Sequence, residues 1–349
     1  METRELRPGY RITRIIRGGW QLAGGHGAVE REQAIGDLVA SAEAGILTFD
    51  CADIYTGVEE LIGAARRAYA DRHGAAALKA IKVHTKFVPD LAQLNEVDRI
   101  YVRTIIERSL RRLGMERLDL VQFHWWDYAV PGCLDAARWL EELREEGKIE
   151  LIGGTNFDTG HTEKLVASGI DLASMQVQYS LLDARPENAL VEAARKRDIH
   201  LLIYGTVAGG FLSDRWLGKL EPDGQQENRS LTKYKLIIDD FGGWDLFQAL
   251  LRALRKVADR HGVDIATIAS RYMLDLPQVA AVIVGARNRE HLIANLKIAS
   301  VKLTDADRAE VGAILAQRQG PEGDTFELER DREGRHGRIM KYNLSKVAS

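Results

Sequence analysis

Hydrophobic runs of strand length alternate with amphipathic runs of helix length along most of the chain. Apolar, strand-like runs occupy residues 11–20, 46–50, 78–87, 118–125, 149–157, 172–180, 199–207 and 279–286. Between them, apolar residues recur at helical spacing in 29–45, 59–69, 97–114, 134–147, 161–169, 186–198, 245–262 and 288–300. Strands that alternate with helices of this length indicate parallel βαβ units.

Eight such units over about 300 residues predict an α/β chain folded as a closed (β/α)8 TIM barrel. The alternative is a doubly wound open sheet, in which a glycine-rich turn after the first strand opens directly into a helix. Here the corresponding turn contains Gly18 and Gly19, but Trp20 follows them and no helix begins on the glycines. We therefore favour the barrel.

Three segments fall outside this alternation. Residues 209–243 follow the seventh strand and read as a long irregular loop, which is typical of a functional segment. Residues 303–317 predict a helix capped by Thr304. The charged tail, 317–349, contains enough apolar residues for us to expect that it packs against the barrel. We expect one domain, 1–349, with a core at 10–316.

Composition narrows the classes of partner. The chain has 349 residues, is 45% hydrophobic and carries a formal net charge of -3, so neither nucleic acid nor an anionic membrane is indicated. No apolar run approaches the length of a membrane span, and the N-terminus does not resemble a signal peptide. Cys51 and Cys133 make no disulfide framework. We expect a cytoplasmic protein, monomeric or homo-oligomeric, that acts on a small molecule.

Ionisable side chains stand at the carboxyl ends of three successive strands, where TIM barrels carry their chemistry. These are Asp50, Lys86 and His124, and Tyr55 lies in the loop after Asp50. A tyrosine has a pKa of about 10, which a neighbouring ammonium lowers. Lys86 can be that ammonium, Asp50 can hold it, and His124 can orient or polarise a substrate oxygen. The set predicts a proton donor for an oxygen that gains negative charge, as a carbonyl does when hydride reaches its carbon.

Six segments together resemble the aldo-keto reductase superfamily: FDCADIYTGVEELIG, HTKF, LDLVQFHWWD, GGTNF, MQVQYSLLD and IVGARNREHLIANL. They follow the order of that family across residues 10 to 300. The resemblance implies a barrel that binds a nicotinamide dinucleotide. It also implies a catalytic tetrad of Asp50, Tyr55, Lys86 and His124, in which Tyr55 donates the proton.

The resemblance further implies a set of cofactor-binding residues. Thr155, Asn156 and Gln176 would hold the carboxamide, and Tyr204 would stack on the nicotinamide. The remaining positions are Gly205, Thr206, Val207, Gly209, Gly285, Ala286, Arg287, His291 and Asn295. Gly205 and Thr206 stand where the family often has Ser-Pro, and Ala294 stands where an acid is usual. Because Arg287 suits a 2′-phosphate, we expect NADP(H) to be preferred and NAD(H) to be possible.

Each of these residues also has a simpler interpretation, such as a turn aspartate or a surface lysine, and only their combination favours catalysis. The family uses the positions of Trp20 and Trp125 to line the substrate pocket, although both could be ordinary core residues. We expect no metal site and no catalytic role for Cys51, which strand alternation turns toward the helices. His84 and Gln122 point inward below the tetrad and could form a polar pair there or find separate partners.

Three functions compete. The leading hypothesis is a reversible NAD(P)H-dependent reductase of aldehydes and ketones. The second is a cofactor-binding regulatory subunit, since some potassium-channel β subunits share this barrel. The third is a metal-dependent hydrolase, against which the ammonium of Lys86 argues.

Overall fold

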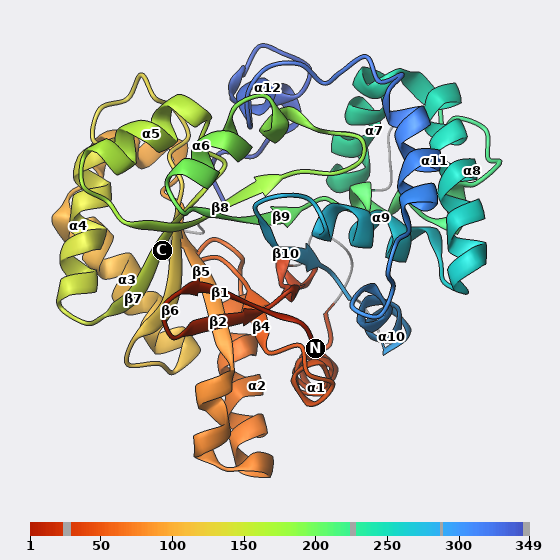
Figure 1. Ribbon diagram of the computed structural model, residues 1–349. Helices are drawn as coiled ribbons and strands as arrows, with labels where there is room; N and C mark the ends of the chain where they lie inside the picture. The colour runs from red at the N-terminus through yellow and green to blue at the C-terminus, as the bar shows by residue number, and fades with distance from the viewer. Residues whose placement is uncertain (24–28, 224–227, 287–288, 345–349) are drawn as a thin grey trace.

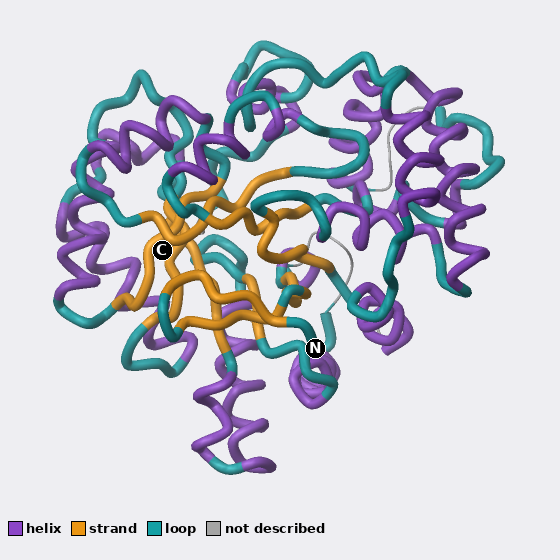
Figure 2. The backbone as a smooth tube through the Cα atoms, in the orientation of Figure 1, coloured by secondary structure: helices purple, strands orange, loops and turns teal. Residues whose placement is uncertain are grey.

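The computed structural model describes residues 1–23, 29–223, 228–286 and 289–344. Its centre is a closed barrel of parallel strands in the order β10-β3-β4-β5-β6-β7-β8-β9. Figure 2 shows these strands at the centre of the molecule with helices around them. The strands are β3 (Ile15–Gly18), β4 (Thr48–Asp50), β5 (Lys82–Phe87), β6 (Leu118–Phe123), β7 (Ile149–Thr155), β8 (Leu172–Gln178), β9 (His200–Tyr204) and β10 (Val279–Val284). The predicted (β/α)8 architecture is confirmed.

Helices follow the barrel strands along the chain and cover the outside of the barrel (Figure 1). They are α1 (Arg31–Glu43), α2 (Val58–His73), α3 (Arg99–Leu113), α4 (Cys133–Glu145), α5 (Thr159–Ala167), α6 (Leu190–Lys196), α9 (Ile265–Leu274) and α10 (Arg289–Ile298). Aspartates cap several of them; the Asp98 side chain accepts from the Tyr101 amide at 2.7 Å at the start of α3. Thr304 forms the predicted cap of α11 (Asp305–Leu315), as a capping box with Asp307.

An N-terminal hairpin closes one end of the barrel. Strands β1 (Thr3–Arg7) and β2 (Tyr10–Thr13) pair antiparallel, so the first predicted strand is split between this hairpin and β3. Leu6, Tyr10 and Ile12 are buried in one cluster with barrel residues that include Leu120 and Leu202. The hairpin therefore fills the end of the barrel opposite the predicted tetrad.

The segment at 209–243 is more regular than expected. It contains α7 (Arg229–Phe241), which is followed directly by α8 (Gly243–His261). Leu231, Tyr234, Ile238 and Phe241 of α7 are buried. Their spacing of three to four residues is helical, and this pattern was overlooked among the glycines and polar residues nearby.

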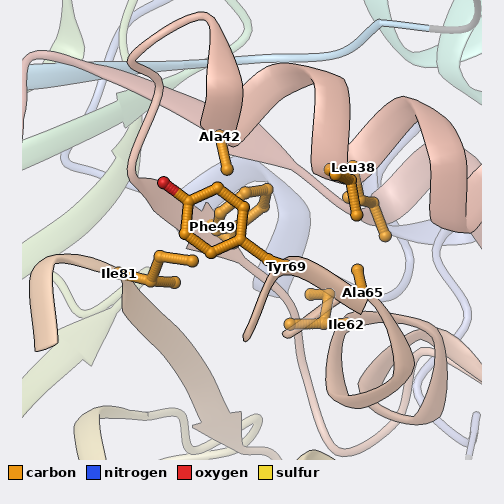
Figure 3. Close-up of a pocket in the computed structure, with 8 residues that line it drawn as sticks. Leu38, Ala42, Phe49, Ile62, Ala65, Tyr69 and Ile81 are labelled. Carbon is orange, nitrogen blue, oxygen red and sulfur yellow. The ribbon is translucent and has the colours of Figure 1, made fainter. Parts of the chain in front are cut away.

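The space between α1, α2 and β4 contains a small cavity, shown in Figure 3. Its walls include Leu38, Phe49, Ile62 and Tyr69, and its volume is about 10 Å³. That is the space of about one water molecule, and almost all of the lining is apolar. It is a packing gap between the helix layer and the barrel wall.

The tail packs against the barrel, as predicted, and it does so across the carboxyl ends of the strands. The Glu329 carboxylate binds Arg185 after β8, and Arg330 donates to backbone carbonyls after β6 and β7. The Leu344 amide donates to Asp90 after β5 at 2.8 Å. In Figure 1 the short helix α12 (Glu327–Arg330) lies at the top of the view between α6 and α7.

A buried cluster of charges fixes this tail. Arg185 bonds both Asp183 at 2.7 Å and Glu329 at 2.9 Å, and Lys233 of α7 lies 3.6 Å from Glu329. Glu329 is fully buried. Burial alone would raise the pKa of Glu329, but Arg185 and Lys233 outweigh it and hold that pKa at about 2. The carboxylate is therefore ionised wherever the protein is folded near neutral pH.

We expect Glu329→Gln to lower the free energy of unfolding by about 3 kcal/mol, because removing one member of a buried ion pair leaves its partners uncompensated. Urea unfolding measures this loss. Glu333→Gln is the matched control, since the Glu333 side chain is 92% exposed and should leave stability unchanged. Equal unfolding curves for the two variants would contradict the stabilising role of the cluster.

Candidate active site

The predicted aspartate and lysine form a buried ion pair at the ends of β4 and β5. Lys86 Nζ lies 2.8 Å from Asp50 Oδ2 and 3.0 Å from Oδ1, and it also donates to the Cys51 carbonyl at 2.6 Å. Both side chains are almost fully buried. Burial alone would lower the pKa of Lys86, but Asp50 outweighs this effect and brings the pKa to about 12. Lys86 is therefore a permanent cation in this site.

Two glutamines complete the shell of Asp50. Gln122 Nε2 donates to Asp50 Oδ1 at 3.1 Å, and Gln176 Nε2 donates to the same oxygen at 2.6 Å. Gln122 therefore supports the aspartate from below. The ring of His84 lies over Tyr10, with centroids 6.3 Å apart, and His84 and Gln122 share no hydrogen bond in the part of the chain that the structure describes. Burial lowers the pKa of His84 to about 3, so this imidazole is neutral.

Tyr55 lies beside the ion pair, in the turn between β4 and α2. Its ring centroid is 5.1 Å from Lys86 Nζ. The sequence led us to expect a lowered pKa, and this was wrong. Burial raises the pKa of Tyr55 to about 12, outweighing the opposing effect of the Lys86 charge. Tyr55 therefore carries its proton at neutral pH.

His124 follows β6 and is held in one orientation by backbone. Its Nδ1 lies 2.8 Å from the Thr155 carbonyl, which can only accept, so Nδ1 carries the proton. Burial, aided by the charge of Arg330, lowers the pKa of His124 well below its usual value. The ring is thus neutral with an unprotonated Nε2, which is buried and meets no protein partner among the described residues. Trp126, Phe157 and Phe326 surround it with aromatic rings.

The residues predicted to hold the nicotinamide lie on three neighbouring strand ends. Asn156 has a left-handed backbone, with φ of 59°, and its backbone N–H donates to the backbone carbonyl of Gln176 at 2.9 Å. Tyr204 Oη donates to Asn156 Oδ1 at 2.9 Å. The Thr155 hydroxyl turns to the Gln176 carbonyl at 3.2 Å. Tyr204 and Asn156 therefore present an aromatic ring beside a carboxamide.

The predicted positions after β9 have varied surroundings. Gly205 and Gly209 have φ of 83° and 64°, values that favour glycine, and Tyr234 of α7 packs against both. The buried Thr206 hydroxyl bonds Ser270 at 3.0 Å and so anchors the turn to α9, while Val207 is half-buried.

The predicted positions after β10 are only partly described. Asn295 Nδ2 donates to the Gly285 carbonyl at 3.0 Å and thereby holds this turn against α10. Ala286 is buried and His291 is exposed. Arg287 lies outside the described residues.

The two tryptophans predicted to line the pocket differ in position. Trp20 is 38% exposed and its ring meets Tyr55 edge-on, with centroids 5.0 Å apart. Trp125 is fully buried, and its indole nitrogen donates to the Val130 carbonyl at 3.1 Å. Trp125 is therefore a core residue in this structure, contrary to expectation. Phe326 and Arg330 were not predicted from the sequence, because their contacts are with segments distant along the chain.

Comparison with known proteins now identifies the family. The sequence model of the Aldo/keto reductase family matches residues 14–316. The chain belongs to this family. It is 26% identical to aldo-keto reductase YhdN of Bacillus subtilis, over 88% of this chain and 91% of the relative. It is 24% identical to the NADH-specific methylglyoxal reductase of Escherichia coli, over 85% and 92% of the two chains.

A solved structure agrees with this assignment. The glycerol dehydrogenase of Gluconobacter oxydans superimposes with a TM-score of 0.73 and 25% identity, covering 91% of this chain and 96% of that one. Members of the aldo/keto reductase family are oxidoreductases that use nicotinamide cofactors and act on small carbonyl compounds. The site fits such a cofactor, since His124, Asn156 and Tyr204 lie at the ends of β6, β7 and β9 on one rim of the barrel, and His124 Nε2 has no partner among the described residues. No helix in the described ranges is both long and apolar enough to cross a membrane.

We expect Asp50→Asn to destabilise the protein more at pH about 7 than at pH about 9.5. Without the carboxylate, burial pushes the pKa of Lys86 below that of the unfolded chain. The unfolded state then binds more protons, so stability rises with pH. In the wild type the Lys86 pKa of about 12 lies above its pKa in the unfolded chain. The stability that Lys86 contributes is therefore lost only at alkaline pH. Urea unfolding at both pH values measures the difference, and the exposed Asp171→Asn is the control. A loss of stability in Asp50→Asn that is the same at both pH values would contradict the conclusion that Asp50 keeps Lys86 charged.

Proposed function

We propose that this protein reversibly reduces aldehydes and ketones to alcohols, with Tyr55 as the proton donor, and that NADPH is its preferred cofactor. The observation that carries this proposal is the position of the Tyr55 ring, whose centroid lies 5.1 Å from Lys86 Nζ beside the Asp50–Lys86 pair. Burial raises the pKa of Tyr55 to about 12, so the phenol has a proton to give. A reduced nicotinamide supplies hydride when it is bound. The residues described above would supply the proton, orient the substrate and exclude water from the site.

The four tetrad residues have distinct roles in this proposal. Tyr55 gives its proton to the substrate oxygen as negative charge develops there. Lys86 lies close enough to stabilise the phenolate left behind, and Asp50 keeps Lys86 charged and in place. His124 Nε2 is a hydrogen-bond acceptor in the assigned tautomer, so it can hold the hydroxyl of the alcohol. Trp20, beside Tyr55, would form part of the substrate wall.

The direct test is Tyr55→Phe, assayed as NADPH oxidation with an activated aromatic aldehyde. We expect kcat to fall by about 10²–10⁴-fold, the usual contribution of a positioned acid, while the Kd for NADPH is unchanged. Tyr69→Phe is a matched control, since Tyr69 lines the cavity between α1 and α2. Wild-type protein that binds NADPH tightly but reduces no aldehyde or ketone would instead favour the regulatory subunit.

The preference for NADPH rests on Arg287, whose guanidinium suits a 2′-phosphate. One relative is an NADH-specific reductase, so the family alone does not decide the preference. We expect Arg287→Met to weaken NADPH binding by about tenfold and to leave NADH binding unchanged, because NADH lacks the phosphate. Fluorescence titration with each cofactor measures both constants. An equal loss for the two cofactors would contradict selection at this position.

A further inference from the structure

Arg330 joins two loops of the active site from outside the part of the chain that the family model matches. That match ends at residue 316, and Arg330 lies in α12 of the tail. Its Nη1 donates to the carbonyls of Trp125 and Trp126 at 2.5 and 2.6 Å, and its Nη2 donates to the carbonyl of Asn156 at 2.7 Å. One planar guanidinium thus bonds the backbone after β6 and the backbone after β7.

The bonded carbonyls flank the functional side chains. Trp125 and Trp126 directly follow His124, and Asn156 carries the predicted carboxamide contact. His124 Nδ1 already bonds the Thr155 carbonyl across the same two strand ends. Arg330 therefore makes a second bridge beside the first. A rigid fork with several donors suits this task, since it bonds carbonyls in fixed directions.

The arginine is itself held firmly. Its guanidinium lies 4.0 Å from the ring centroid of Tyr128, and the preceding residue, Glu329, is fixed by Arg185 and Lys233. Phe326, one turn earlier, lies edge-on to the ring of His124, with centroids 5.7 Å apart. Within the described ranges, the guanidinium donates its hydrogen bonds to backbone carbonyls rather than to a carboxylate.

We propose that Arg330 is a positioning residue of the active site, which sets the orientation of His124 and the left-handed backbone of Asn156 by bridging the loops after β6 and β7. The proposal rests on the proposed function for its catalytic consequences. A left-handed asparagine is uncommon and persists only where surrounding bonds favour it. Arg330 and the Gln176 carbonyl supply such bonds on either side of Asn156.

The surroundings of His124 make its imidazole a direct reporter. Arg330 is the charged group that acts on it from the tail. From the other packed elements, Trp126, Phe157 and Phe326 contribute rings without charge. Lys86 on β5 and Asp50 on β4 are already paired with each other. The tautomer and protonation of His124 should therefore respond to Arg330.

The experiment compares Arg330→Met, Arg330→Lys and the control Arg332→Met. Arg332 is a neighbouring tail arginine whose side chain is 54% exposed and whose guanidinium pairs with Asp127 at the rim. Two readouts need no turnover: the Kd for NADPH, and the ¹⁵N resonances of His124 over a pH titration in histidine-labelled protein, assigned with His124→Asn. Turnover of an activated aromatic aldehyde is measured in parallel.

For Arg330→Met we expect NADPH binding to weaken about tenfold and kcat to decrease by a larger factor than KM for the aldehyde changes. We also expect the His124 ring to populate both of its tautomers. Arg330→Lys keeps the charge but loses the fork, so it should retain a low His124 pKa while NADPH binding stays weakened. Arg332→Met should match the wild type. Should Arg330→Met fail to fold, Arg330→Lys decides by the same readouts.

Wild-type NADPH binding and an unchanged His124 tautomer in the folded Arg330 variants would overturn the proposal. Neither of these two measurements depends on catalysis. If the wild type reduced no carbonyl compound, the proposed function would fail, while the cofactor affinity and the imidazole resonances would still decide the role of Arg330.

Discussion

The arrangement of the candidate active site depends on one buried ion pair, Asp50 with Lys86. Two charges removed from water are costly unless their remaining hydrogen-bonding capacity is met. Here Gln122, Gln176 and the Cys51 carbonyl meet it. Because these groups come from β4, β5, β6 and β8 or their ends, one carboxylate holds several strand ends in register. The closed barrel positions the ion pair, and the hydrogen bonds of the ion pair in turn hold the strand ends of the barrel together.

The pair also determines what the neighbouring phenol can do. Burial makes Tyr55 a weaker acid than free tyrosine, and the lysine charge reduces that penalty without removing it. The phenol therefore keeps its proton at rest and is best suited to give it up when an oxygen beside it becomes negative. A group that ionised readily at neutral pH would have no proton to offer at that moment.

Much of this could be predicted from the sequence, because barrels obey simple periodic rules. Strand and helix alternation predicted the architecture, and the carboxyl ends of the predicted strands identified Asp50, Lys86 and His124. The periodicity stops where a strand ends. Trp125 lies beyond β6, so period-two reasoning could not place it, and it proved to be core. The direction of the Tyr55 pKa shift was missed because sequence shows a neighbouring charge but not the depth of burial.

The tail contacts were harder to foresee, since Arg330 binds backbone carbonyls, which leave no signature in side-chain identity. These contacts have a consequence for biosynthesis. The ribosome makes the strands with Asp50, Lys86 and His124 first, and Phe326, Glu329 and Arg330 emerge well after β10. A nascent chain can therefore close its barrel while the loops around His124 still lack their final support. The contacts that support His124 are thus completed only after all eight barrel strands have been synthesised.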